Sequence, residues 1–273
     1  MKIALIQQHA SEDKSENIRR GLEALDQAAA SGASVAVFAE LAFERFYPQR
    51  PADHDPLRLA EPVPGPLTAA FAERAKRHGI VVVLNLYERD GECAYDSSPV
   101  IDADGTLVGR TRMIHITDYA CFHEQGYYTP GDTGAPVYDT KAGRIGVAIC
   151  YDRHYPEYMR ALALGGADLV VIPQAGAVGE WPDGLYEAEL QVAAFQNGYY
   201  TALCNRVGEE ECLTFSGESF VCGPDGRVIA RAPAMQDAIL YADVDLSTTA
   251  RSHARRLFMR DRRPELYAAW IGR

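Results

Sequence analysis

The 273-residue chain lacks paired cysteine motifs, long apolar runs and a secretory signal. Its six cysteines show no C-x-x-C spacing, which argues against a zinc site and against a disulfide framework, so we expect most of them to be reduced packing residues. No apolar run approaches the roughly 18 residues that suggest a membrane span, and Met1–Ile6 opens directly as a strand. These absences predict a cytoplasmic protein with no membrane partner.

Positive charge is also scarce. The chain has 27 Lys and Arg against 38 Asp and Glu, a formal net charge of -11, and its basic residues gather only in Arg251–Arg263. This balance disfavours a nucleic-acid partner and favours a small molecule. What the chain does have is 47% hydrophobic residues over a length that suffices for one sizeable core.

Strand-like and helix-like segments alternate along the chain without a linker, repeat or low-complexity stretch. This alternation predicts one α/β domain, and the Asp-Gly turn at 102–105 adds an antiparallel hairpin and so a mixed sheet. A second hairpin is expected around residues 224–226. We expect helices at 16–30, 67–78, 156–164 and 185–195, and strands at 3–8, 35–39, 80–87, 94–101, 107–116, 145–149, 169–172 and 199–205.

Cys150 is the first candidate catalytic residue, because an apolar strand ends there and a helix follows from Pro156. Backbone N–H groups at the start of a helix are unpaired and carry partial positive charge, so they stabilise a thiolate and lower the pKa of the cysteine. The alternative is that Cys150 is simply a small buried hydrophobe.

Two acids are the next candidates. Glu40 ends the apolar run that starts at Val35, at the kind of strand end where α/β sheets bind ligands. It is either a solvated strand end or a general base with a raised pKa. Glu124 lies in a long loop rich in aromatic and turn-forming residues, and ordered loops of that length are usually functional.

These residues sit in motifs that resemble the carbon–nitrogen hydrolase (nitrilase) superfamily, in its branch of N-carbamoylputrescine amidases and β-ureidopropionases. The resemblance implies a four-layer αββα sandwich with two mixed β-sheets, usually dimeric or larger. It also implies that Glu40 is the general base, Cys150 the nucleophile and Glu124 a supporting acid. The motifs lie at 3–7, 38–41, 46–48, 128–132, 149–156, 205–208 and 260–267.

The family's catalytic lysine does not match. The resemblance places it where this chain has Met113, and the four lysines of the chain fall at a strand start, helix flanks or a hairpin turn. Arg112 is a possible substitute, but a regular strand that points Met113 at the thiol turns Arg112 away, leaving it a charge on the outer face unless a bulge intervenes. Two hypotheses follow. The protein is an amidase whose electrophilic group is replaced or relocated, or a ligand-binding or regulatory relative with impaired turnover.

The remaining predictions concern the substrate. The backbone N–H of Tyr151 is the expected oxyanion donor by resemblance, and the segment from Gln174 to Asp183 supplies a pocket wall through Trp181, unless Trp181 is core or interface. An acidic wall with Glu180 or Asp183 would suit an amide or ureido substrate with a distal ammonium group. A distal carboxylate would instead prefer Arg153 or Arg206, although Arg153 could simply pair with Asp152 or a dimer partner.

No metal and no organic cofactor is implied by the motifs. We expect a single domain over residues 1–273 in which 252–273 forms a C-terminal arm. By resemblance the arm packs across the interface of a homodimer or higher homo-oligomer, and otherwise it is a solvated basic tail.

Overall fold

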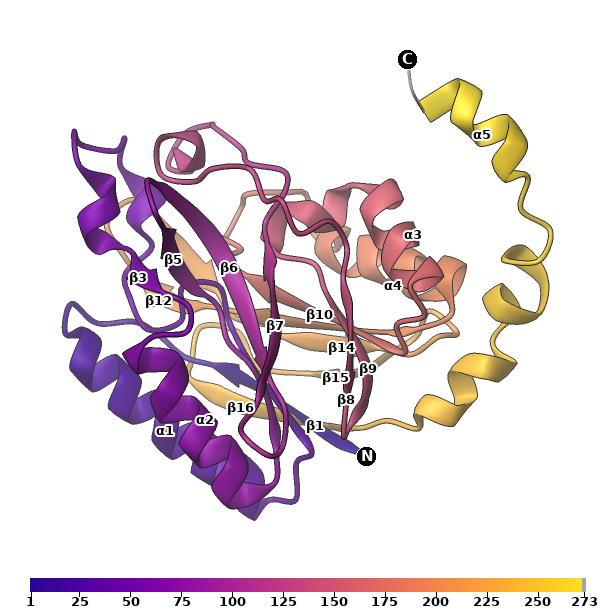
Figure 1. Cartoon of the computed structure of the whole chain (residues 1–273), viewed down its shortest axis with the longest axis horizontal. Coiled ribbons are helices and arrows are strands. Elements are labelled where there is room, and N and C mark those ends of the chain that lie inside the picture. Colours follow the sequence, from indigo (N-terminus) through magenta and orange to yellow (C-terminus); the bar gives the residue numbers. More distant parts are fainter. Residues whose placement is uncertain (272–273) are drawn as a thin grey trace.

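Two mixed β-sheets lie face to face between two pairs of helices in the computed structural model, which describes residues 1–271 (Figure 1). Each sheet has a parallel centre, β1-β2-β4 in one and β9-β10-β11 in the other, with antiparallel strands added outside it. The first sheet has the order β16 (Ala238–Asp243), β1 (Lys2–Gln7), β2 (Val35–Phe38), β4 (Val81–Val83), β6 (Cys93–Ile101), β5 (Leu86–Asp90) and β3 (Glu61–Pro62), and β7 (Leu107–Arg112) also pairs with β6. The second has the order β15 (Val228–Arg231), β14 (Phe220–Cys222), β11 (Tyr200–Asn205), β10 (Leu169–Gln174), β9 (Gly143–Val147) and β8 (Val137–Thr140).

Helices α1 (Lys14–Ala30) and α2 (Pro66–His78) cover the outer face of the first sheet, while α3 (Pro156–Leu164) and α4 (Leu185–Asn197) cover that of the second. Local sequence sets their ends. The Asp13 side chain accepts from the first free backbone N–H groups of α1, and α2 starts with proline. Gly79 ends α2 in the left-handed conformation at φ 66°.

The main core fills the space between the two sheets. Strand β2 is buried on both faces because a helix covers one side and the second sheet covers the other, which explains its uninterrupted apolar sequence. Side chains such as Leu5 and Val37 of the first sheet pack in one cluster with Ile145 and Val171 of the second. The expected four-layer αββα sandwich is confirmed. No helix among residues 1–271 is both long and apolar enough to span a membrane.

Small elements complete the chain. Strands β12 (Val207–Glu209) and β13 (Thr214–Ser216) form a separate hairpin, and 3-10 helices include Glu124–Gly126 and Cys150–His154. After a π-helical turn at Ala254–Phe258, α5 (Pro264–Ile271) stands away from the four layers (Figure 1) and buries none of its residues. Ala254 is 0% exposed and Arg255 pairs with Asp168 at 2.9 Å, so the start of the segment packs on the body of the protein. The arm expected over 252–273 stays a prediction, and 272–273 lie outside the described residues.

Two predicted strands are wrong in extent. The strand expected at 80–87 is split into β4 and β5, because the Asn85 side chain turns inward and accepts from Leu41 N at 2.7 Å. The strand expected at 107–116 ends at Arg112, because the backbone N–H groups of Ile114 and His115 donate to the Asp152 carboxylate and not to a neighbouring strand.

One pair of cysteines also departs from the sequence prediction. Cys121, in the loop that carries Glu124, forms a disulfide with Cys212 between β12 and β13, across a sequence separation of 91 residues. The other four cysteines are free. A pairing over such a distance depends on the tertiary fold, so the spacing of cysteines in the sequence does not reveal it.

Candidate active site

The three candidate catalytic side chains meet between the two sheets. Glu40 follows the end of β2, Cys150 follows β9, and Glu124 starts a 3-10 helix in the long loop after β7. The Cys150 Sγ and one carboxylate oxygen from each acid all lie within 4.8 Å of one another, close enough to contact a common reacting atom or cation. Glu40 and Glu124 are 0% exposed and Cys150 is 5% exposed, so the centre is dry.

The backbone turns sharply at Cys150. Cys150 has φ 42°, and Leu41, directly after Glu40, has φ 43°. A positive φ in a non-glycine residue costs on the order of 1–3 kcal/mol and persists only where the surrounding structure enforces it. Here the strained residues follow two strand ends, and the turn takes the side chains out of the strand direction into the centre.

Burial and like charges dominate the electrostatics. Burial, followed by the charge of Glu124, raises the pKa of Glu40 to about 8. Burial and the charge of Asp96 raise the pKa of Glu124 well above its usual range, because burial and a nearby like charge both disfavour the ionised form. The pKa of Cys150 is also raised, by burial and by both glutamates, although Arg153 opposes this. The lowered thiol pKa expected from the sequence is therefore wrong for the ligand-free centre, because desolvation outweighs the helix end.

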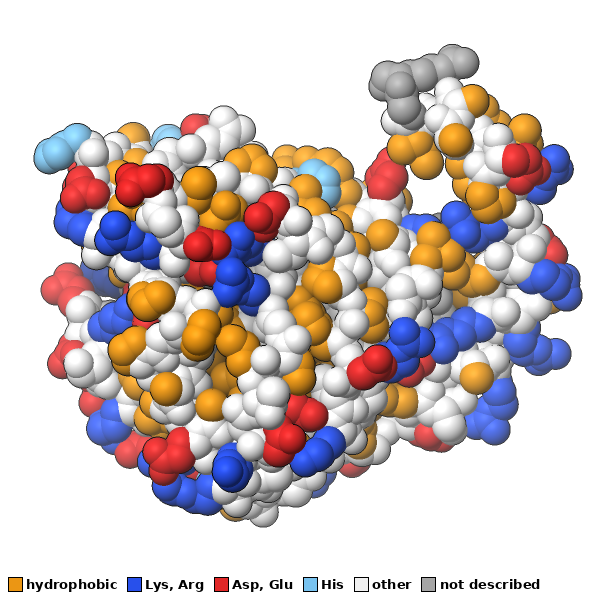
Figure 2. All heavy atoms as spheres, viewed as in Figure 1, with side chains coloured by type: hydrophobic (Ala, Val, Ile, Leu, Met, Phe, Trp, Pro, Cys, Tyr) orange, Lys and Arg blue, Asp and Glu red, His pale blue; other side chains and the backbone are white. Residues whose placement is uncertain are grey.

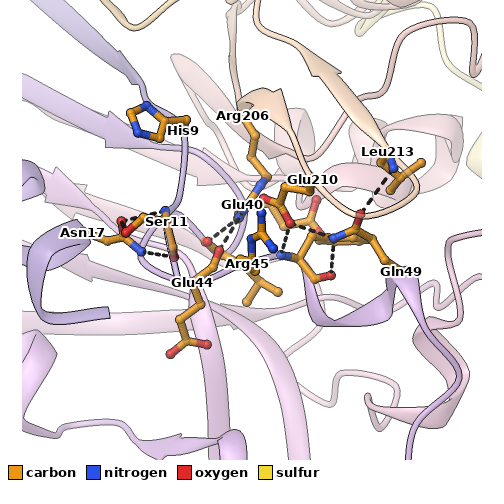
Figure 3. Close-up of polar contacts among 12 residues, drawn as sticks. His9, Ser11, Asn17, Glu40, Glu44, Arg45, Gln49, Arg206, Glu210 and Leu213 are labelled. Carbon is orange, nitrogen blue, oxygen red and sulfur yellow. Dashed lines mark hydrogen bonds and ion pairs between the residues drawn. The ribbon is translucent and has the colours of Figure 1, made fainter. Parts of the chain in front are cut away.

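Arg206 fixes the loop that carries Glu40. Its guanidinium is 1% exposed and donates to the backbone carbonyls of Glu40 at 2.9 Å, of Glu44 at 2.8 Å and of Leu41, while it pairs with the Glu210 carboxylate (Figure 3). Arg206 thus uses its charge and its N–H groups on protein atoms. The structure thus assigns Arg206 to supporting the loop, whereas the sequence suggested it as a contact for a substrate carboxylate.

Arg153 and Gln174 form a buried pair behind the thiol. Arg153 Nη1 donates to the Cys150 carbonyl at 2.8 Å and to Gln174 Oε1 at 2.7 Å, and its Nε pairs with Glu189 at 3.2 Å. A guanidinium can only donate, so it orients the amide with its N–H₂ group toward Cys150. Gln174 Nε2 indeed donates to Sγ at 3.3 Å. Arg153 is committed to these contacts and does not offer a free charge for a substrate.

Met113 and Arg112 point in opposite directions, as alternation along a strand predicts. Met113 is 0% exposed and packs in the same cluster as Cys150. Arg112 pairs with Glu88 at 2.7 Å, Asp90 at 2.6 Å and Asp132 at 3.0 Å. No bulge reverses the two side chains, so Arg112 does not replace a cation beside the thiol.

The lysines lie elsewhere. Lys2 begins β1, Lys14 begins α1 and pairs with Glu44 and Glu61, Lys76 is in the last turn of α2, and Lys141 lies between β8 and β9. Among residues 1–271, two guanidinium groups lower the pKa of groups in the centre: Arg206 acts on Glu40, and Arg153 acts on Cys150. Both are already bonded to protein groups.

The loop after β10 covers the centre. Glu180 accepts from Tyr119 Oη at 2.6 Å and from Ala177 N at 3.1 Å, and it also accepts from Tyr186. Its charge contributes to the raised pKa of Cys150. The half-buried ring of Trp181 lies 6.3 Å from that of Tyr119, and its buried Nε1 has no protein partner. Glu180 therefore lies near Cys150, and Trp181 packs against Tyr119 beside it. Their contact with a substrate stays a prediction.

Tyr151 follows Cys150, and the centroid of its ring lies 5.0 Å from that of His154. Next to it, Asp152 is buried and accepts from His115 Nδ1 at 2.7 Å, so it supports the turn after Met113 and leaves Arg153 to other partners. The role of the Tyr151 N–H as oxyanion donor stays a prediction.

Sequence reasoning missed Asp96. This residue of β6 is 0% exposed, interacts with Glu40 and shares a buried network with Asn85. The sequence gives little signal, because Asp96 is followed by Ser97 and Ser98, and only the structure shows that β6 is buried from Ala94 to Ile101. A charged residue in such a position is rare unless it is paired or functional.

The model of the carbon-nitrogen hydrolase family matches residues 2–254, which include the whole centre. The chain belongs to the carbon–nitrogen hydrolase family. N-carbamoylputrescine amidase from Solanum lycopersicum is 34% identical over 97% of this chain and 93% of its own length. The crystal structure of a carbon–nitrogen hydrolase from Helicobacter pylori G27 superimposes with a TM-score of 0.92 at 29% identity, covering 99% of this chain and 98% of that one.

A structure of an amidase mutant from Nesterenkonia sp. AN1 bears directly on the chemistry of this carbon–nitrogen hydrolase fold. It has a TM-score of 0.83 and 25% identity, and it covers 99% of this chain and 96% of that one. In it the acetamide moiety of fluoroacetamide is covalently attached to the active-site cysteine. The family resemblance predicted from the motifs is thus confirmed, and a cysteine nucleophile has a direct precedent in a relative.

Proposed function

We propose that this carbon–nitrogen hydrolase cleaves non-peptide C–N bonds, of an amide or an N-carbamoyl amine, through a thioester on Cys150. The observation that carries the proposal is the meeting of one thiol and two buried acids within 4.8 Å. A thiol needs a base to become a good nucleophile, and an acid with a pKa near neutrality serves as one. Glu40, with a pKa of about 8, meets that requirement.

In the first half of the reaction Glu40 takes the thiol proton while Sγ attacks the amide or ureido carbon. The Tyr151 N–H and Gln174 Nε2 stabilise the oxyanion, the latter from its place 3.3 Å from Sγ. Glu40 returns the proton to the leaving nitrogen, so that an amine or ammonia departs and a thioester remains.

Water completes the cycle. Glu40 again acts as the base, now on the water that attacks the thioester, and the product acid leaves as Cys150 recovers its proton. Glu124 accepts from Thr117 N at 3.4 Å through one oxygen, while its other oxygen, buried and without a protein partner, orients the attacking group. No step uses a metal or an organic cofactor.

Met113 slows this chemistry. The loss of one oxyanion donor typically costs about 10²–10³ in rate. Gln174 supplies a neutral donor where a cation is missing, so turnover is retained at a reduced rate. A ligand-binding relative without turnover is the alternative that the absence of a cation favours, and it predicts binding of amides with no product in a steady-state assay.

Charge near Cys150 favours a substrate with a distal ammonium group. The charge of Glu180 acts on Cys150, and its hydrogen-bond donors, two tyrosines and a backbone N–H, are neutral. The charges of Arg153 and Arg206 are instead paired with Glu189 and Glu210. Replacing Glu180 by Gln should lower kcat/KM for N-carbamoylputrescine by about 10–100-fold, the loss typical of a charged contact, and much less for a neutral amide.

The control for this prediction is Asp183→Asn, which removes an exposed acid of the same loop. Steady-state kinetics on both substrates measures the two losses. Equal losses on the cationic and the neutral substrate would show that Glu180 only supports the loop through its tyrosine contacts.

Exposed apolar side chains on the arm and on α4 support a homodimer or larger assembly. On the described arm Leu257, Leu266 and Trp270 are 43%, 40% and 61% exposed, and basic side chains follow the arm in Figure 2. Helix α4 exposes Val192 at 51%. Such large apolar side chains are typical of covered interfaces.

Truncation at Ser252 should therefore reduce the mass of the assembly in light scattering, because it removes the apolar arm. A single substitution in the full chain, Trp270→Ala, should also reduce the mass of the assembly. An unchanged mass after truncation would assign the arm to solvent.

A further inference from the structure

Asp96 lies directly across the strand pair from Met113. In the antiparallel pair of β6 and β7, Ser97 is opposite Arg112, and Met113 N donates to Asp96 O at 2.9 Å one step further along. Opposite residues share a face of the sheet with Cβ atoms about 4.5–5.5 Å apart. A buried carboxyl group and a buried thioether are therefore neighbours at the place where the resemblance expects a cation.

The Asp96 side chain is held in one orientation. Its Oδ1 accepts from Asn85 Nδ2 at 2.5 Å, and Asn85 Oδ1 accepts from Leu41 N at 2.7 Å, so the same amide links Asp96 to the loop that carries Glu40. Asp96 Oδ2 and both carboxylate oxygens of Glu40 are buried and have no hydrogen-bond partner. These unpartnered oxygens belong to two side chains that lie close enough for each to change the pKa of the other.

Two facing carboxyl groups in a dry site do not both ionise, since each charge raises the pKa of the other group. Burial and the charge of Glu40 raise the pKa of Asp96 well above its usual range. A proton on Asp96 that Glu40 can accept lowers the pKa of Glu40 against the larger effect of burial. The titratable and charged groups that act on this pair from the surrounding elements are Glu124, Asp152, Cys150, Tyr128 and Arg206.

We propose that Asp96 is a positioning residue that keeps a proton on Oδ2 and uses it to donate a hydrogen bond to the Glu40 carboxylate, so that a protonated acid stabilises the general base in this cation-free centre. The inference deepens the proposed function. Asp96 neither releases its proton nor receives another: the thiol proton passes to the second oxygen of Glu40, and the hydrogen bond from Asp96 stabilises the charge that Glu40 carries before that transfer.

Two substitutions of Asp96 test whether its effect on Glu40 comes from a donated hydrogen bond. Asp96→Asn keeps the shape, because its Oδ1 accepts from Asn85 while its N–H₂ group takes the place of the protonated Oδ2. Asp96→Ala removes the donor. The readout is the rate at which iodoacetamide alkylates Cys150 between pH 5 and 10, followed by peptide mass spectrometry with Cys150→Ala as the blank. The low-pH limb of this profile reports the shared ionisation of Cys150 and Glu40.

We expect Asp96→Asn to keep the wild-type low-pH limb and Asp96→Ala to move it upward by about one pH unit, a tenfold slower alkylation at pH 7. The exposed-site control Asp104→Asn should match the wild type. An unshifted low-pH limb in Asp96→Ala would overturn the proposal. A tenfold slower alkylation of Asp96→Asn at pH 7 would also overturn it. This variant is isosteric, and its thermal unfolding shows whether the fold is kept.

Alkylation needs no turnover, so this result is independent of the proposed function. A protein whose Cys150 follows the expected profile but that releases no product from any amide would contradict the hydrolase activity and still support the role of Asp96.

Discussion

Replacing Met113 by Lys is expected to raise kcat/KM on N-carbamoyl amines and simple amides by about 10²–10³-fold, the usual contribution of one preorganised oxyanion donor. Met113 is fully buried beside Cys150 and across from Asp96, so a lysine there faces acids that have no other lysine near them. Its ammonium group stabilises the oxyanion and the thiolate together.

The pH dependence should change as well. Glu40, with a pKa of about 8, is mostly protonated at pH 7, so the wild-type kcat/KM should rise as pH increases toward 8. A cation at position 113 favours the ionised form and lowers that pKa, so the rise should move to lower pH. Met235→Lys, at a position 49% exposed, is the control and should change neither value. A Met113→Lys variant that folds but gains no activity would show that the site works by another arrangement.

Replacing Cys150 by Ala is expected to abolish turnover, with a loss on the order of 10⁴ or more, because the nucleophile is part of a unit whose members do not act independently. Fold and ligand binding should survive, since the substitution removes one buried atom. Cys93→Ala, at a half-exposed free thiol, is the control and should retain activity. Residual activity in Cys150→Ala above a few per cent would mean that water attacks the substrate directly.

Much of the fold was predictable because local sequence and long-range packing agree. The apolar run before Glu40 and the one before Cys150 are both strands that end at the centre, and Pro156 begins α3 as expected. Burial on both faces explains why these runs are uninterrupted. Glu124 needed the resemblance as well, because nothing local distinguishes one loop acid from another.

The remaining features depend on contacts between residues far apart in the chain. Arg206 looked like a substrate contact, yet the fold places it 166 residues from Glu40 in sequence and within hydrogen-bond distance of its carbonyl. Arg153 similarly binds Gln174 across 21 residues. The split between β4 and β5 follows from Asn85 turning toward Leu41, a tertiary hydrogen bond that overrides the strand pattern. Periodicity describes one element at a time and does not report such pairings.

The most direct test is the intact mass of the protein after rapid acid quenching during reaction with N-carbamoylputrescine. A Cys150 nucleophile predicts an adduct on the Cys150 peptide that is absent from Cys150→Ala: a carbamoyl group if the amine leaves first, or the N-(4-aminobutyl)carbamoyl group if ammonia leaves first. Product release without any adduct on that peptide, or an adduct of the same size in Cys150→Ala, would contradict covalent catalysis by this thiol.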